Sequence, residues 1–160
     1  MSHHSRDEGF SLMEVMTAMV ISGIALMGTM GAVEMASKYV LQGSLSSRAL
    51  ELAHGRLEAK RSVRWQSLLE DDLDHDGVPE VVMKDDGQGL DSIAGDGIYT
   101  AMQEHDRVTL VWTVEADRPG PLGQVGMVAI RATASYESPN GRKEVRMATL
   151  RANPTFMGRR

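Results

Sequence analysis

The sequence predicts an α+β protein in which one long N-terminal helix packs on a small antiparallel sheet. Three observations predict this fold class. An uninterrupted apolar segment lies near the N-terminus, an amphipathic segment without proline follows it, and short runs of alternating apolar and polar residues begin after residue 106. A helix that covers one face of a meander of three or four strands is an α+β arrangement, and 160 residues suit one domain with an appendage.

The apolar segment is long enough to span a membrane. Lys, Arg, Asp and Glu are absent from Val15 to Val33. A helix from Phe10 to Val33 would be about 36 Å long, and the hydrocarbon layer of a bilayer is about 30 Å thick. We therefore expect residues 10–36 to form a transmembrane or filament-core helix. A simple single-pass anchor would not explain Glu14, because a lone carboxylate in a membrane costs a few kcal/mol unless it finds a partner.

The residues at the start of this segment carry a family resemblance. Gly9-Phe10-Ser11-Leu12-Met13-Glu14-Val15, followed by about twenty apolar residues, resembles the class III signal of type IV pilins and of the pseudopilins of type II secretion. The resemblance implies that residues 1–9 are a leader. A prepilin peptidase would cut between Gly9 and Phe10 and methylate Phe10, and Glu14 would align each subunit with its neighbour. The leader has Arg6 as its one fixed cation, so it specifies orientation poorly.

Physical chemistry gives a reason for that glutamate. A cut before Phe10 creates an ammonium group at the edge of an apolar helix. When such helices lie side by side, Glu14 of one helix can pair with the ammonium group of another, which offsets the desolvation cost of both groups. A buried ion pair of this kind is better evidence for register than for stability.

Residues 37–69 are expected to continue the helix in amphipathic form. Its apolar positions fall on one half of a helical wheel, and we expect that face to be buried: Leu41, Leu45, Ala49, Leu52, Ala53 and Leu57. Several basic residues also lie along this segment, and we interpret them as a solvated face: Arg48, Arg56, Lys60, Arg61 and Arg64.

Residues 70–106 form an acidic loop region with twelve acidic residues against Lys84. Within it, Asp72-Leu73-Asp74-His75-Asp76-Gly77 reads D-x-D-x-D-G, with Glu80 close behind. Alternating carboxylates before a glycine can aim several oxygens at one point, as Ca²⁺ requires. Position twelve is Met83, so the loop is not a standard EF-hand and resembles the calcium loops of extracellular bacterial proteins. We predict a calcium site at Asp72, Asp74, Asp76 and Glu80, with a solvated acidic turn as the alternative.

A second loop, residues 85–100, ends in G-D-G-x-Y-T and resembles a loop of secreted β-sandwich domains. Its glycines supply positive φ angles and its aspartates cap turns, so we favour an architectural role over a second ion site.

Residues 107–160 are predicted to form the antiparallel sheet and a C-terminal tail. Alternation predicts strands from Val108 to Val114, over 125–136 and over 142–151, with a hairpin turn at 138–141. Residues 78–84 are predicted as an additional strand.

Composition and isolated motifs argue against two other classes of function. A net charge of −5 makes nucleic acid an unlikely partner, and none of His54, His75 and His105 has a serine and an acid arranged around it in sequence, so we expect no enzyme. A DNA-uptake or adhesion subunit would use the C-terminal basic residues, which would otherwise protect a sheet edge: Arg142, Lys143, Arg146, Arg151, Arg159 and Arg160.

The sequence therefore predicts a minor pilin that primes or caps a type IV pilus. The alternative is a minor pseudopilin of a type II secretion system. Its expected partners are a prepilin peptidase, other pilins, an inner-membrane assembly platform and the lipid bilayer. It would be a single-pass protein of the bacterial inner membrane with its C-terminal domain outside the cytoplasm.

Overall fold

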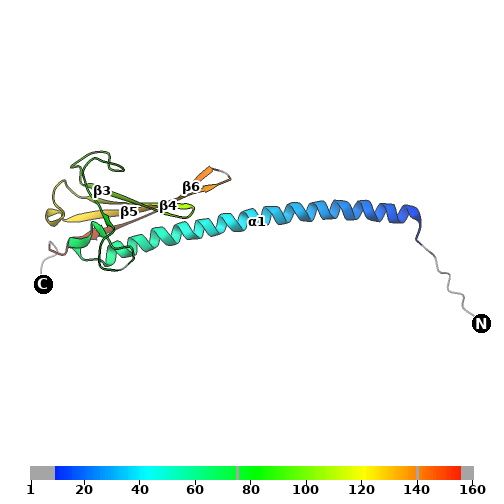
Figure 1. Ribbon diagram of the computed structural model, residues 1–160, viewed down its shortest axis with the longest axis horizontal. Coiled ribbons are helices and arrows are strands. Elements are labelled where there is room, and N and C mark those ends of the chain that lie inside the picture. Colours follow the sequence, from blue (N-terminus) through cyan, green and yellow to red (C-terminus); the bar gives the residue numbers. More distant parts are fainter. Residues whose placement is uncertain (1–9, 75, 140, 156–160) are drawn as a thin grey trace, which may run out of the picture. The chain divides into compact units, whose positions relative to one another are not determined.

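The computed structural model describes residues 10–74, 76–139 and 141–155. The elements in chain order are α1 (Leu12–Ser62), the 3-10 turn η1 (Trp65–Ser67), β1 (Glu70–Asp71), β2 (Val81–Val82), β3 (Ile98–His105), β4 (Val108–Ala116), the 3-10 turn η2 (Leu122–Gln124), β5 (Met127–Ser138) and β6 (Gly141–Ala152) (Figure 1). A division after Gln42 separates a helical unit from a unit that begins at Gly43.

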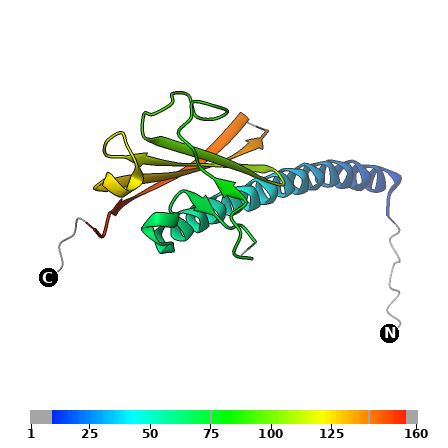
Figure 2. The same cartoon turned by 60° about the vertical axis from the view of Figure 1, so that its left-hand side comes forward.

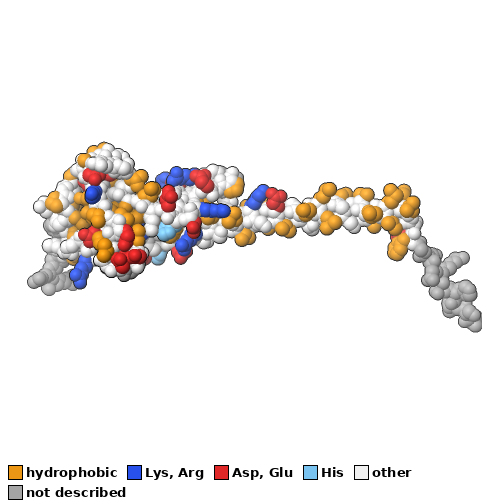
Figure 3. Space-filling view, in the orientation of Figure 1, with side chains coloured by type: hydrophobic (Ala, Val, Ile, Leu, Met, Phe, Trp, Pro, Cys, Tyr) orange, Lys and Arg blue, Asp and Glu red, His pale blue; other side chains and the backbone are white. Residues whose placement is uncertain are grey.

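The helical unit contains the part of α1 up to Gln42. Its large apolar side chains are exposed, and hydrophobic patches recur along the helix (Figure 3). Glu34 and Lys38 form an exposed ion pair in the same unit. Among the described residues, α1 is the one helix whose length and composition would let it cross a membrane. Exposed apolar surface of this extent requires a cover of lipid or of other apolar helices.

The second unit has the predicted α+β fold. Its four-stranded antiparallel sheet has the order β3-β4-β5-β6, and the second half of α1 lies on one face of it (Figure 2). The α1 residues Ala49, Ala53 and Leu57 are buried in one cluster with inward-facing sheet residues such as Trp112 and Ile130. Because two of the three helix residues are alanines, the helix backbone can approach the sheet closely.

The edge strand β3 was not predicted. We expected an additional strand over 78–84, but only Val81 and Val82 pair there, with β1. The fourth strand of the main sheet is instead Ile98–His105. Its inward-facing side includes Gln103, whose Oε1 accepts a hydrogen bond from Arg56. A polar residue on the buried side obscures the alternation by which a strand is recognised.

The hairpin between β5 and β6 is confirmed, since Ser138 pairs with Gly141. Gly141 has a φ of 96°, a conformation that side chains with a Cβ rarely adopt.

Helix α1 ends at Ser62, earlier than the predicted 69. The guanidinium of Arg151 in β6 donates hydrogen bonds to the carbonyl oxygens of Lys60 and Val63 and so satisfies the end of the helix. Trp65 is buried directly after this point, and its indole N–H donates to the carbonyl of Leu122. The sequence offered no local signal for a cap that comes from a strand about ninety residues away.

Candidate functional site

Glu14, which the sequence placed at the assembly site, lies on the first turn of α1, and Phe10 of the processing site precedes the helix. Phe10 is 83% exposed, and Glu14 is exposed on the first turn. Gly9 lies outside the described residues. The backbone N–H of Glu14 donates to the carbonyl and to the hydroxyl of Ser11, so Ser11 caps the helix.

The capping role of Ser11 was missed at the sequence level, although serine three residues before glutamate is a known signature of a helix start. In a full capping box the glutamate side chain also returns a hydrogen bond to the serine N–H. Within the described chain, no ion pair or hydrogen bond engages the carboxylate of Glu14. The charge of Glu14 is thus free to meet a partner from outside this helix.

Beside Glu14, one side of the helix is hollowed. A shallow depression of about 700 Å³ is lined by Phe10, Glu14 and the small residues Ala18, Ser22 and Gly23, among others. Small side chains in a membrane helix permit another helix to approach closely. The carboxylate therefore lies at the edge of a surface suited to helix packing.

The predicted calcium residues come together in the structure. One carboxylate oxygen from each of Asp72, Asp74, Asp76 and Glu80 lies within 4.8 Å of the others. Their remaining contacts are with the loop backbone, for example Gly77 N–H to Asp72 at 2.9 Å. Oδ1 of Asp72 is buried and has no hydrogen-bond partner among the described residues, so the donor set fits a hard cation. Calcium binding itself stays a prediction.

The second loop is built largely by its own aspartates. Asp85 accepts hydrogen bonds from the backbone N–H groups of Gly95, Asp96 and Gly97, and buried Asp91 accepts one from Gly87. These bonds agree with an architectural role. One carboxylate oxygen from each of Asp85, Asp91 and Asp96 also lies within 4.8 Å of the others.

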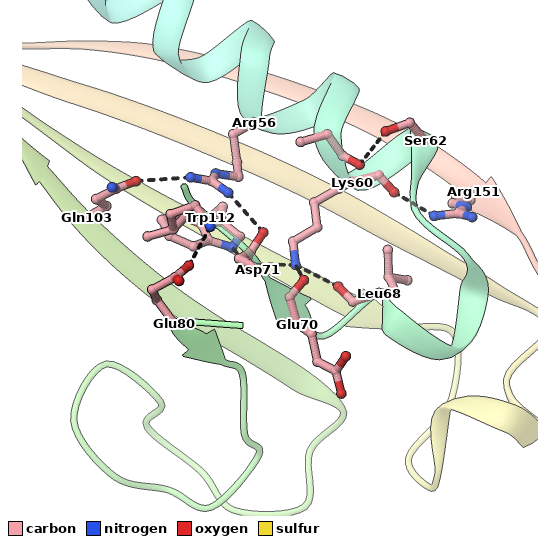
Figure 4. Close-up of polar contacts among 12 residues, drawn as sticks. Arg56, Lys60, Ser62, Leu68, Glu70, Asp71, Glu80, Gln103, Trp112 and Arg151 are labelled. Atoms are coloured by element: carbon pink, nitrogen blue, oxygen red, sulfur yellow. Dashed lines mark hydrogen bonds and ion pairs between the residues drawn. The ribbon is translucent and has the colours of Figure 1, made fainter. Parts of the chain in front are cut away.

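A buried ionic network joins α1 to β1 and to β4 of the four-stranded sheet (Figure 4). The sequence did not predict this network. Asp71 of β1 pairs with Arg56 at 2.9 Å and with Lys60 at 2.8 Å, and it accepts the indole N–H of Trp112 at 3.0 Å. The Arg56 guanidinium lies 4.3 Å from the centre of the Trp112 ring. The interpretation of Arg56 and Lys60 as part of a solvated face was therefore wrong.

The sequence signal was ambiguous because a basic side chain on the edge of a helix's polar face can be exposed or can reach inward over its apolar stem. Arg48 and Arg61, in contrast, are exposed and pair with glutamates on α1 itself, as a solvated face requires. What distinguishes the two sets is Asp71, whose position depends on how the chain returns after the helix.

A comparison with protein-family models finds a match that includes the start of α1. Residues 4–30 match the model of the prokaryotic N-terminal methylation motif. Searches of curated proteins and of solved structures found no match.

Proposed function

Because residues 4–30 carry the class III signal of the type IV pilin family, we propose that this type IV pilin-like protein is a minor pilin that primes or caps pilus assembly. It is made as a precursor, cut between Gly9 and Phe10 by a prepilin peptidase, and N-methylated on Phe10. The observation that carries the proposal is Glu14: an exposed carboxylate that has no partner among residues 10–74, 76–139 and 141–155, on the first turn of a membrane-length apolar helix.

The apolar half of α1 supports insertion of the subunit in two successive environments. In the bacterial inner membrane, lipid covers the exposed side chains, and the C-terminal unit lies outside the cytoplasm. In a filament, helices of neighbouring pilins replace the lipid. When an inner-membrane assembly platform transfers the subunit from the membrane to the filament, the apolar side chains stay in apolar surroundings. The free-energy cost of transferring these side chains is therefore small, and only the charged groups need a new partner.

The charges can be satisfied by pairing between subunits. Once Phe10 is the first residue, its amine lies four residues before Glu14, which corresponds to about 6 Å along the axis of a helix extended to Phe10. When Glu14 of one subunit meets the amine of its neighbour, the two helices are therefore displaced axially by about that amount. A mismatch would leave both charges without partners in apolar surroundings, so the pair selects one register.

Two features of the sequence support the role as a minor subunit. The chain has no cysteine for the C-terminal disulfide that is common in major pilins, and it has an elaborate acidic loop region. The alternative is a minor pseudopilin of a type II secretion system, which would share the same processing and the same helix.

A DNA-uptake or adhesion role is the second alternative, and the contacts of the basic residues disfavour it. Arg151 is engaged by the end of α1, and Arg146 pairs with Glu144 on the same strand. Arg159 and Arg160 lie outside the described residues. Binding to nucleic acid would therefore depend on few uncommitted cations in a protein with a net charge of −5.

Mass spectrometry of the protein from its native membrane tests the processing step. We expect a mature chain that begins with a singly methylated Phe10, and we expect Gly9→Ala to leave the precursor uncut. Gly23→Ala is the matched control, because its added Cβ would meet no atom within 4 Å. A mature chain with any other first residue would overturn the proposal.

Deletion of the gene tests the choice of system. If the protein primes or caps a pilus, deletion lowers the number of surface pili, and wild-type protein restores it while the Gly9→Ala variant does not. Normal piliation together with loss of protein secretion would assign the chain to the alternative, a type II secretion system.

A further inference from the structure

The two acidic loops contain three aspartyl–glycine pairs: Asp76–Gly77, Asp86–Gly87 and Asp96–Gly97. In such a pair the glycine nitrogen can attack Cγ of the aspartate, because glycine has no side chain that hinders the approach. The N–Cγ bond forms, one water molecule leaves, and a five-membered succinimide results. Water then opens the ring at either carbonyl and gives aspartate or isoaspartate. Each pair is therefore a site at which the backbone can isomerise without an enzyme.

The fold requires glycine at all three positions. Gly77, Gly87 and Gly97 have φ angles of 92°, 68° and 82°, which residues with a Cβ rarely adopt. A Cβ on Gly87 would also lie 2.9 Å from the backbone nitrogen of Ala94. A larger residue, which would slow the attack on the aspartate, would strain these turns. Isomerisation must be limited in another way.

The same two hydrogen bonds surround each pair. The glycine N–H donates to the carboxylate of an aspartate outside the pair: Gly77 to Asp72 at 2.9 Å, Gly87 to Asp91 at 2.7 Å and Gly97 to Asp85 at 2.8 Å. The aspartate of the pair accepts a bond from the N–H two residues further on, at 2.8 Å for Asp76, 3.1 Å for Asp86 and 2.9 Å for Asp96. The second bond is the usual Asx turn. The first depends on the path of the loop, since its acceptor lies five, four or twelve residues away.

Both bonds oppose formation of the succinimide. The glycine nitrogen must lose its proton during the attack, and a hydrogen bond to a carboxylate holds that proton in place, because the negative charge disfavours its loss. The carboxylate of the pair must also leave its own hydrogen bond before Cγ can move onto the nitrogen. The reaction is thus restricted to the times when the loop opens locally.

We propose that Asp72, Asp91 and Asp85 protect the aspartyl–glycine bonds at residues 76, 86 and 96 from isomerisation. Isoaspartate adds one carbon to the main chain, so it would displace the glycine and the N–H that closes the Asx turn. Protection of this kind preserves the loops of a subunit that is not replaced once it is in place. The role goes beyond the proposed function and does not depend on it.

A purely architectural role of the same aspartates makes a different prediction. If Asp85 and Asp91 only held the shape of the second loop, removal of either would loosen the whole loop and accelerate isomerisation at Asp86 and Asp96 alike. A protective role predicts that each removal acts on one bond, because each carboxylate holds the N–H of a different glycine.

Mass spectrometry of the ageing full-length chain distinguishes the two roles. The protein is kept in detergent with a chelator at 37 °C for several weeks and is then digested with trypsin. Residues 85–107 form one tryptic peptide, which contains Asp86 and Asp96, and residues 65–84 form another, which contains Asp76. Isoaspartate has the mass of aspartate, but its peptide elutes separately and electron-transfer dissociation locates it.

The expected pattern is a crossover between two variants. Asp91→Ala should accelerate isomerisation at Asp86 at least fivefold and leave Asp96 within twofold of the wild type, and Asp85→Ala should do the reverse. Asp76, in the other loop, should keep its wild-type rate in both variants. Ser92→Ala, exposed beside Asp91, is the matched control. No acceleration, or equal acceleration at Asp86 and Asp96, would overturn the proposal.

A second measurement uses the wild-type chain alone, so it does not depend on whether a variant folds. In concentrated guanidinium chloride the protecting bonds are absent, and all three aspartates should isomerise at least tenfold faster than in the folded chain. Equal rates in the folded and the denatured chain would show that these hydrogen bonds give no protection. Neither result bears on the first residue of the mature protein, so the proposed function is tested separately.

Discussion

The Nζ atom of Lys60 lies 2.8 Å from Oδ2 of Asp71, and the two side chains are 1% and 4% exposed. Lys60 also donates to the carbonyl oxygens of Leu68 and Glu70. Burial lowers the pKa of Lys60 below its ordinary value, and the opposing attraction of Asp71 only partly offsets this. With Arg56 on the other oxygen, one carboxylate balances two cations at the joint between α1 and the sheet.

We predict that Asp71→Ala destabilises the protein more than Lys60→Met. Loss of the carboxylate leaves two buried cations without an anion, and breaking such a network costs about 3–5 kcal/mol. Loss of the lysine leaves a neutral Arg56–Asp71 pair and two carbonyls without their donor, at about 1–3 kcal/mol. Denaturant unfolding of the full chain in detergent, followed by the fluorescence of buried Trp65 and Trp112, measures both.

The control for this comparison is Arg61→Met, which breaks an exposed pair with Glu58 and should change stability by less than about 1 kcal/mol. Equal losses for Asp71→Ala and Lys60→Met would show that the imbalance of charge has no energetic weight.

We predict that ionisation of Tyr99 makes the stability of the protein depend on pH above pH 10. Burial, and after it the negative charge of Asp85, raises the pKa of Tyr99 above its ordinary value of 10.0. Between these two pKa values the unfolded chain loses its phenolic proton first, so the free energy of unfolding falls as pH rises. Thermal unfolding from pH 9 to 11 should show a shallower decline in Tyr99→Phe, whereas Tyr39→Phe, exposed in α1, should follow the wild type.

The acidic loop predicts a calcium response. Millimolar Ca²⁺ should raise the unfolding temperature of the wild-type chain, and a chelator should reverse the effect, because an ion that binds only the folded state stabilises it by mass action. Asp74→Asn with Asp76→Asn removes two of the four carboxylates and should abolish most of the shift. Mg²⁺ at the same concentration is the control ion. A wild-type protein with no calcium-dependent shift would eliminate the site.

Glu14→Gln should leave membrane insertion and processing intact but reduce incorporation into filaments at least tenfold. The amide keeps the size and the helix start, but it lacks the charge that would meet a neighbour's amine. Immunoblots of sheared filaments and of the membrane fraction measure the two pools. Thr17→Val, which removes another polar group from the same helix, serves as the control. Wild-type incorporation of Glu14→Gln would remove the pairing argument.

The parts of the fold that depend on local pattern were predicted from the sequence. The helix, its buried face at Ala49, Ala53 and Leu57, and the β5–β6 hairpin follow from periodicity and turn chemistry. The carboxylates of Asp72, Asp74, Asp76 and Glu80 also lie close together as predicted, because their convergence depends on their close spacing in the sequence and not on distant segments.

Features that depend on distant partners were not predicted. The burial of Arg56 and Lys60 is decided by Asp71, and the end of α1 by Arg151. The strand β3 was hidden because Gln103 on its inner side serves Arg56 rather than the apolar core. Each of these depends on which segments become neighbours, which a single sequence does not contain in local form.

The bonds from Arg151 to α1 also constrain the order of events during biogenesis. The residue that closes the end of the helix is made about ninety positions after its acceptors. Until the ribosome has synthesised nearly all of β6, the globular unit lacks its last strand, and the carbonyl oxygens of Lys60 and Val63 lack the hydrogen bonds that Arg151 donates. The N-terminal segment is therefore available to enter a bilayer well before the globular part can mature, and a truncated product would be left tethered but unfinished.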